Sequence, residues 1–489
     1  MSNNGHVGTQ GEFRGDFTRD TFDPSKHFSR VLMQQGRVQL DADWNEQTSI
    51  LLHYLQTLAA GLIGPHGGPG DGFKIQDKDK DNKPYTRKFA ISPGHYYVGG
   101  VLCENASTEP VLYDSQTDFR LEDKDKLSAD GNYLVYLDVW ERHVNCLQDF
   151  DDDNPSICEV ALKGPDTATR ARIVWQVKVL ETSLVIGDLK TKNPDGDYQK
   201  FLAELNVKKL VKPGAGQLRA RAKKAEGQDD ACCISPETRY RGAENQLYRV
   251  EIHRAGGAWD GKDGTKSSAA TFKWSRENAS VAFPIRKLVT SSDGTTTVSL
   301  ESLGRDALHS LKEGDWIEIV DDDYILQNGS EPLLQVDTIN RDDNEVTLKG
   351  TTKSQVGENP AKHPLLRRWD HKGGDPKSGG LTIDDDGAAL LHEESNDKGW
   401  LNLENGIQIQ FPPQTTTANY RTGDYWLIPA RVATGDVEWP GTVDKPESRP
   451  PHGIQHYYAP LWIISVKPSG EVTADPGDDC RRKFGPLTS

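Results

Sequence analysis

The chain has 489 residues, which is long enough for two to four domains with hydrophobic cores. Acidic residues outnumber basic ones by 74 to 58, and the net charge of −16 argues against a general nucleic-acid binder. The 46 Gly and 27 Pro residues favour turn-rich β architecture over a helix bundle. We therefore expect a mainly β, multi-domain protein of β-sandwich or small-barrel modules with one N-terminal amphipathic helix.

The cysteines and the N-terminus indicate a protein that is made in a cytoplasm. None of the six cysteines lies in a CxxC pair, so the usual metal-site signature is absent and we expect reduced thiols. A disulfide between Cys146 and Cys158 is the alternative for these two residues. The first residues contain no apolar run of the kind that signal peptides carry. No stretch reaches the roughly 18 apolar residues that a membrane-spanning helix needs.

Residues 1–72 are expected to serve in assembly or attachment. Four aromatic residues are spaced through the polar sequence at its start: Phe13, Phe17, Phe22 and Phe28. An exposed aromatic arm is unfavourable unless it docks on something. It could fold back on its own chain, or it could clip into a neighbouring subunit.

A helix is predicted over residues 43–62. Asp41 and Asp43 can cap its start, and Gly64 marks its end. Its apolar stripe recurs at alternating steps of four and three and consists of Trp44, Thr48, Leu51, Leu55, Leu58 and Leu62. Either the helix lies on a sheet or bundle of its own chain, or it is repeated in a symmetric oligomer. The residues expected at an assembly interface are Phe17, Phe22, Phe28, Trp44, Leu51, Leu55, Leu58 and Leu62.

Residues 73–187 are expected to form a first β-rich domain. Strong strand patterns occupy residues 133–144 and 171–181. The loop at 77–85 has the spaced aspartates of a calcium loop but lacks its Gly and its bidentate Glu, which favours a solvated hairpin loop. The acidic loop at 149–156 is interpreted in the same way, because consecutive carboxylates usually stay hydrated.

Residues 188–242 are predicted to be a basic linker with a short helix near 197–212. A run of basic side chains follows without an acidic residue and includes Lys208, Lys209, Lys212, Arg219 and Arg221. In an acidic protein this island could dock on an acidic partner subunit or another polyanion. The alternative is a solvated linker.

Residues 243–370 are predicted to form a second β-rich domain, whose hairpins from 291 onward suggest an SH3- or OB-like barrel. Several charged residues near its start could be gathered into a catalytic carboxylate pair: Glu244, Glu251, His253, Arg254, Arg276 and Glu277. The spacing does not require this, and structural ion pairs are the alternative.

Residues 371–489 are expected to form a C-terminal β-rich domain. Asn405 and Gly406 predict a hairpin between two strands. His452 and His456 have the helical spacing of a zinc pair, but the neighbouring Pro and Gly residues make a helix unfavourable, so no metal is expected. The chain contains no catalytic or nucleotide-binding fingerprint, and we expect neither a cofactor nor enzymatic activity.

Several long strings resemble an uncharacterised bacterial family encoded with phage-tail-like genes, including those of contractile injection systems. They include RDTFDPSKHFSRVLMQQGRVQLDADWNEQ, GPDTATRARIVWQVKV, GAENQLYRVEIHRAGG, TFKWSRENASV, YRTGDYWLIPAR and PPHGIQHYYAPL. The likeness covers almost the whole chain. It implies a setting in a tail-like particle, and it implies no reaction and no catalytic residues.

We therefore expect a structural subunit of such a particle, in the outer baseplate or in an attached fibre or cage. Its partners would be baseplate, sheath or tube proteins and copies of itself, with a trimer preferred and no nucleic acid. It would be assembled in the bacterial cytoplasm and released as part of an extracellular particle. The alternative is a carbohydrate-binding or carbohydrate-active protein that stacks sugars on Trp259, Trp274, Trp369, Trp400, Trp426 and Trp439.

Overall fold

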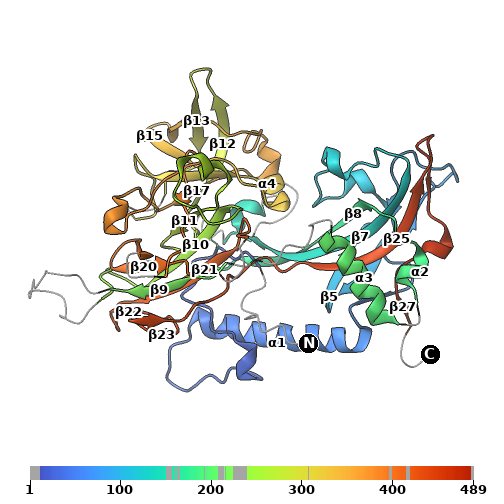
Figure 1. Cartoon of the computed structure of the whole chain (residues 1–489), viewed down its shortest axis with the longest axis horizontal. Helices are drawn as coiled ribbons and strands as arrows, with labels where there is room; N and C mark the ends of the chain where they lie inside the picture. Colours follow the sequence, from blue (N-terminus) through green and yellow to red (C-terminus); the bar gives the residue numbers. More distant parts are fainter. Residues whose placement is uncertain are drawn as a thin grey trace, which may run out of the picture.

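The fold was analysed in a computed structural model that describes residues 11–149, 157–159, 161, 166–191, 193–207, 214, 216–223, 239–304, 306, 308–395, 399–414 and 419–485. Two β-rich lobes lie side by side, and helix α1 (Asp41–Ile63) runs beneath both of them (Figure 1). The prediction of a mainly β chain with several sheets and one N-terminal helix is confirmed.

The main sheet of the first lobe has the order β26-β25-β7-β8. Its strands are β7 (Gly131–Val144), β8 (Arg170–Glu181), β25 (Tyr457–Val466) and β26 (Val472–Thr473). The two strong strand patterns near 133–144 and 171–181 pair antiparallel, with Leu137 opposite Val177. On the other edge of β7, Ala459 lies opposite Leu137, so a strand from the end of the chain completes this sheet.

Two smaller sheets and two helices complete the first lobe. The sheets are β27-β1-β4-β5 and β2-β3-β6, formed by β1 (His66–Pro69), β2 (Ile75–Gln76), β3 (Ala90–Ile91), β4 (Gly94–Val98), β5 (Val101–Asn105), β6 (Val111–Leu112) and β27 (Lys483–Phe484). Helices α2 (Ile186–Leu189) and α3 (Pro194–Val207) cover the main sheet, where Phe201 and Leu205 pack against Leu134 and Ile463. The short helix predicted near 197–212 is thus present and begins at Pro194.

The second lobe contains a five-stranded sheet of order β18-β11-β10-β21-β22 and a three-stranded sheet of order β19-β20-β9. These strands are β9 (Arg219–Ala222), β10 (Gln246–Arg254), β11 (Thr271–Ser275), β18 (Ala389–Leu390), β19 (Leu401–Asn402), β20 (Ile407–Gln410), β21 (Tyr425–Arg431) and β22 (Asp436–Val437). A short pair, β23 (Gly441–Thr442) and β24 (Lys445–Pro446), lies beside them. Strands of the segment 371–489 are therefore shared between both lobes.

A closed six-stranded barrel stands on the second lobe (Figure 1). Its strands are β12 (Ala282–Thr290), β13 (Thr295–Leu300), β14 (Trp316–Val320), β15 (Leu334–Asn340), β16 (Glu345–Lys349) and β17 (Leu365–Trp369). Helix α4 (Asp322–Gln327) follows β14, and its Asp322 accepts an ion-paired hydrogen bond from Arg142 on β7. The predicted barrel-like hairpins do form a barrel, which begins at Ala282, and α4 joins it to the first lobe.

The predicted turn at Asn405 and Gly406 and a second turn at Gly99 and Gly100 are present as tight hairpins. Asn405 and Gly406 both have positive φ, at 49° and 87°, and connect β19 to β20. Gly99 and Gly100 connect β4 to β5 with φ of 58° and 82°. Positive φ at both central residues matches the right-handed twist of the paired strands, which explains why these dipeptides signal hairpins.

Candidate functional site

The arm, residues 11–22, folds back on its own chain and ends in a buried network of charges. Arg14 places Nη2 3.0 Å from both carboxylate oxygens of Glu251 on β10, and its Nη1 lies 2.5 Å from Glu12. Glu251 also accepts a hydrogen bond of 2.6 Å from Arg249 Nε. These side chains are almost fully buried. The sequence allowed the arm to dock either on its own chain or on a neighbouring subunit. The structure shows the arm docked on its own chain.

The network continues from β10 into the barrel. Lys273 on β11 lies 3.4 Å from Glu251 and 2.6 Å from Glu318 on β14. Glu318 also accepts hydrogen bonds from Trp369 Nε1 at 3.0 Å and from the Tyr324 hydroxyl at 2.9 Å. One connected set of ion pairs therefore joins the arm, the five-stranded sheet and the barrel.

The charges of this network compensate each other despite their burial. Burial alone raises the pKa of Glu251, but the neighbouring Arg14, Arg249 and Lys273 lower it well below its ordinary value. Burial opposes ionisation of Glu318 too, yet Lys273 and Arg367 lower its pKa to about 2. Both carboxylates are ionised at neutral pH, and removal of a single cation would leave a buried charge without its partner.

The arm also binds the first turns of α1. Asp41 accepts hydrogen bonds from the backbone N–H of Thr18 at 2.9 Å and from its hydroxyl at 2.6 Å. The expected cap at Asp41 is thus replaced by an arm contact, and Leu40 precedes the first turn, with its N–H 3.3 Å from the carboxylate of Asp43. Further along the helix, Glu46 accepts a hydrogen bond of 2.6 Å from the Thr21 hydroxyl.

The face of α1 that packs on the molecule is not its apolar stripe. Ala42 and Ile50 are the buried residues of this helix, and the polar His53 contacts the ring of Phe22. Near the C-terminal end, a Cβ at Gly100 would lie 2.1 Å from the carbonyl oxygen of Gln56, so only a glycine permits this close approach of the β4–β5 turn. Apart from Ile50, small and polar side chains therefore form the inner face of α1.

The predicted stripe forms the outer face of α1, which we define as Trp44, Leu51, Leu55, Leu58 and Leu62. Trp44 is 66% exposed, Leu55 61% and Leu62 71%. Most of the large apolar side chains that the described residues expose lie between Phe28 and Leu62. The structure thus gathers five of the eight predicted assembly residues on one helix face, and none of the described elements covers that face.

The other three predicted assembly residues have different environments. Phe28 is 51% exposed, whereas Phe17 and Phe22 are partly buried against their own chain. Leu32, Met33 and Val38 are also exposed, and the sequence analysis did not select them. Leu32 and Met33 follow Val31 directly and Val38 stands between polar residues, so these positions have no helical or strand period that could identify them.

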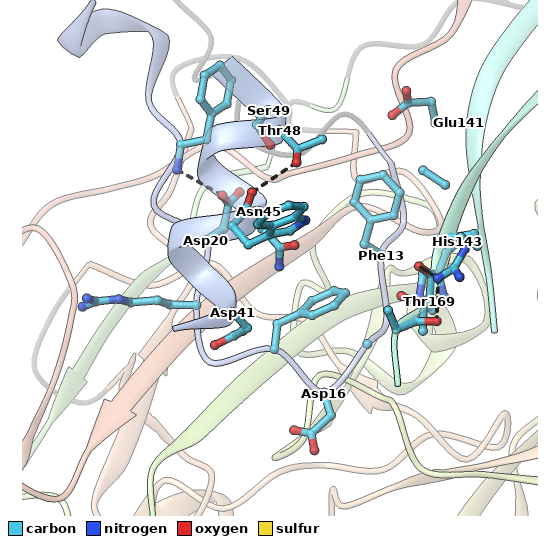
Figure 2. A pocket seen from close by; sticks show the side chains of 18 of the residues that line it. Phe13, Asp16, Asp20, Asp41, Asn45, Thr48, Ser49, Glu141, His143 and Thr169 are labelled. Atoms are coloured by element: carbon cyan, nitrogen blue, oxygen red, sulfur yellow. Dashed lines mark hydrogen bonds between the residues drawn. The ribbon is translucent and has the colours of Figure 1, made fainter. Parts of the chain in front are cut away.

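A cavity of about 920 Å³ lies between the arm, α1, β7 and β21. In Figure 2, Asn45, Thr48 and Ser49 of α1 lie on one side of Phe13, and Glu141 and His143 of β7 lie on the other. Burial and the nearby Arg14 and Arg367 lower the pKa of His143 to about 3, so its ring is neutral at pH 7. The sequence analysis missed this cavity because its walls come from segments far apart in the chain.

Comparison with known families gives one match, to the family of unknown function DUF6519, over residues 13–195 and 203–469. The chain belongs to this family. Comparison with curated proteins and with solved structures found no significant match in either group. The match begins at Phe13, so it includes Arg14 of the arm and the whole of α1.

The predicted basic island is only partly within the described structure. Arg219 Nε donates a hydrogen bond of 2.9 Å to Ser448 Oγ, and Arg221 Nε donates one of 2.9 Å to Gln408. The Arg221 guanidinium also lies 3.9 Å from the ring centre of Trp400. Both arginines bind within their own lobe, whereas Lys208, Lys209 and Lys212 lie outside the described residues.

Four of the six residues considered for a carboxylate pair, Glu251, Arg254, Arg276 and Glu277, lie in ion-pair contacts, whereas Glu244 accepts a hydrogen bond of 3.0 Å from Gln246 and His253 is buried. Arg254 binds Asp384 at 2.6 Å and Asp386 at 2.7 Å, and Arg276 binds Glu404 at 3.0 Å. Glu277 lies 3.4 Å from Arg368, but burial and the nearby Asp370 raise its pKa to about 8. Together with the Arg14–Glu251 pair, these contacts match the structural alternative.

The histidines and aspartates considered for metals have other partners. His456 Nδ1 lies 2.7 Å from Asp138, and His452 stacks on Tyr425. In the loop at 77–85, Asp79 accepts hydrogen bonds of 2.9 Å from the backbone of Asp81 and Lys83, as a hairpin turn requires. The part of the chain that the structure describes contains no group of three or more potential metal ligands. The acidic loop at 150–156 lies outside it.

Most of the tryptophans proposed for sugar stacking are inside the protein. Trp274, Trp369, Trp400 and Trp426 are each at most 7% exposed, so they cannot stack on a bound glycan. Trp259 and Trp439 are partly exposed, and their indole N–H groups donate to the backbone carbonyls of Lys262 and Glu447. The carbohydrate alternative thus loses four of its six predicted contacts.

The remaining predictions concern thiols and membrane spans. Cys103, Cys146, Cys158 and Cys480 form no disulfide in the structure, and Cys232 and Cys233 lie outside the described residues. Within the described ranges, no helix has both the length and the apolar character to cross a membrane.

Proposed function

We propose that this chain is a structural assembly subunit that binds other subunits through the outer face of α1. The observation that supports this proposal is the exposure of Trp44, Leu51, Leu55, Leu58 and Leu62 along one side of a helix. Soluble monomers rarely leave such a continuous apolar surface in water, because its hydration is unfavourable. A partner that covers this face removes it from solvent.

We further propose that the partner is the same helix in other copies of the chain, with a trimer preferred. The outer face alternates by steps of three and four, which suits knobs-into-holes packing between helices. The flanking positions of this seam carry no charge, since they are Asn45, Gln47, Leu52, Tyr54, Ala59 and Gly61. Like-charge repulsion between copies is therefore absent there, and no charge pattern selects a different partner.

The setting that we propose is a phage-tail-like contractile injection particle, in its outer baseplate or in an attached fibre or cage. This part of the proposal rests on the sequence resemblance described above, and it requires contacts with baseplate, sheath or tube proteins. The subunit would act without enzymatic activity and without nucleic acid. It would assemble in the cytoplasm and leave the cell with the particle.

The test replaces two leucines of the outer face by aspartate, as the double variant Leu55→Asp and Leu58→Asp. Light scattering coupled to size exclusion should give the wild type a mass of three times 54.2 kDa and the variant a monomer mass. Val289→Asp is the matched control, because Val289 is 45% exposed on β12 of the barrel, on the opposite side of the molecule from α1 (Figure 1). A wild type that stays monomeric at all concentrations contradicts the proposed trimer.

The particle setting has a separate test in native lysate. The wild type should sediment with sheath and tube proteins, which mass spectrometry identifies, and the double variant should remain in the supernatant. Point variants are better suited than deletion of the N-terminal segment, because deletion also removes Arg14 from the buried network. A wild type that never sediments with tail proteins contradicts the setting, whatever its oligomeric state.

A further inference from the structure

The cavity between the arm and α1 has the size of a small-molecule site. Its volume of about 920 Å³ falls within the range of roughly 300–1,000 Å³ typical of ligand pockets. Its lining comes from the arm, from α1 with the two residues before it, from β7, from residues 166–171 at the start of β8, and from β10 and β21. It lies beside α1 and shares Trp44 with the outer face of that helix, whereas Leu51, Leu55, Leu58 and Leu62 are outside its lining.

The charged groups around the cavity leave an excess of negative charge. Its acidic lining residues are Asp16, Asp20, Asp41, Glu141 and Asp166, and its arginines are Arg19 and Arg170. Arg19 is already paired with Glu438 at 2.8 Å, and Arg170 donates to the backbone carbonyls of Ala168 and Thr169. Burial and the nearby arginines lower the pKa of His143 to about 3, so this lining histidine adds no positive charge at neutral pH. An entering cation therefore meets a favourable field.

Glu141 is the group in this lining that most needs a counter-ion. Its side chain is partly buried on β7, and it has no hydrogen bond or ion pair among the described residues. Burial raises the pKa of its carboxyl. An ionised carboxylate removed from water without a partner is unfavourable, so a bound cation beside it would gain a charge-assisted hydrogen bond. Figure 2 shows the carboxylate at the edge of the cavity, apart from the other labelled side chains.

The apolar part of the lining suits the body of an organic cation better than a bare metal ion. The aromatic rings of the lining belong to Phe13, Phe17, Phe22 and Trp44. Leu52 of α1 adds an aliphatic side chain. Aromatic faces attract ammonium and guanidinium groups and also cover alkyl stems. A divalent metal would instead need several oxygen ligands in place of these rings.

We propose that this cavity binds an organic cation, a primary amine or a guanidinium on a short alkyl stem, whose head group pairs with Glu141. The same chemistry occurs in free amines and in lysine or arginine side chains of a peptide. This site goes beyond assembly through the outer face of α1, with which it shares only Trp44.

Calorimetric titration of the full chain tests the proposal with butylamine, propylguanidine and the capped peptide Gly-Lys-Gly. We expect saturable binding of at least one cation and none of the neutral N-acetylbutylamine. Glu141→Gln should weaken binding by about tenfold, the loss expected for one charge-assisted hydrogen bond. Glu109→Gln is the matched control, because Glu109 is an exposed glutamate outside the cavity lining, and it should bind like the wild type.

A second variant protects the test against a folding defect of Glu141→Gln. Ser49→Arg places a guanidinium on the cavity wall from α1 and should abolish binding while Glu141 stays in place. A peptide that binds more tightly than the free amines identifies a protein side chain as the source, and the reverse order identifies a free amine. Absence of saturable binding by all three cations overturns the proposal, and so does equal weakening by Glu141→Gln and Glu109→Gln.

Discussion

Residues 11–22 bury charged side chains inside the molecule, whereas the helix that follows them exposes leucines to solvent. Arg14 contacts Glu251 at 3.0 Å in a nearly water-free network, and Leu62 at the end of α1 is 71% exposed. Burial of charge is tolerated where each ion has its partner within the same chain. The exposed apolar face of α1 has no such partner among the described residues. The arm is therefore stabilised by contacts within its own chain, whereas the outer face of α1 would be covered only by a second molecule.

Arg14→Ala should break the first side of this contrast and have the largest effect. It leaves Glu251 without one of its cations, and loss of one partner of a buried ion pair costs about 3–5 kcal/mol. Denaturant unfolding measures this free energy. Arg19→Ala is the control, since its pair with Glu438 is over a third exposed and should contribute about 1 kcal/mol or less. Equal and small losses for both variants would mean that the arm does not stabilise the fold.

Two neighbouring residues of α1 allow a finer comparison of its two faces. Ile50 is 1% exposed and Leu51 is 52% exposed. Ile50→Ala should destabilise the chain by about 2–5 kcal/mol, because it leaves a cavity in the packed face. Leu51→Ala should change the stability of the separate subunit by less than about 0.5 kcal/mol. Urea unfolding at low protein concentration measures both. A large loss for Leu51→Ala in the monomer would show that the outer face packs on its own chain.

The pH dependence of stability should reveal the buried carboxylates through smaller effects. The folded pKa of Glu318 is lowered to about 2, so its ionised form stabilises the fold above its unfolded pKa, and this contribution is lost as the pH falls from about 4.5 toward 2. The folded pKa of Glu277 is raised to about 8, so stability should decrease as the pH rises from about 4.5 to 8.

Glutamine variants show which carboxyl group causes each of the two parts of the stability-versus-pH curve, below pH 4.5 and between pH 4.5 and 8. Glu318→Gln should flatten the acidic branch, and Glu277→Gln should flatten the branch up to pH 8, as followed by urea midpoints at several pH values. Glu313→Gln, an exposed carboxylate on the loop before β14, should leave both branches unchanged. An acidic branch that persists in Glu318→Gln would assign it to other groups.

The fold could be predicted from the sequence where the signal was local. The stripe from Trp44 to Leu62 predicted α1 to within a few residues, and Asn405 with Gly406 predicted the β19–β20 hairpin. The candidate site was predicted in part, since five of the eight selected residues lie on the outer face of α1. Phe17 and Phe22 were selected because they are aromatic. Their partial burial depends on tertiary contacts, which no local sequence pattern specifies.

The sequence by itself determined which segments form helices, strands and turns, because hydrophobic period and turn chemistry act over a few residues. Only the tertiary structure decided that β25 pairs with β7, that Arg14 meets Glu251, and that the apolar stripe of α1 faces outward. Each of these depends on contacts between residues distant in the chain, and the free energy of such contacts comes from burial and charge pairing that no local pattern specifies. The inner face of α1 is, apart from Ile50, small and polar because the arm and the β4–β5 turn supply matching partners there.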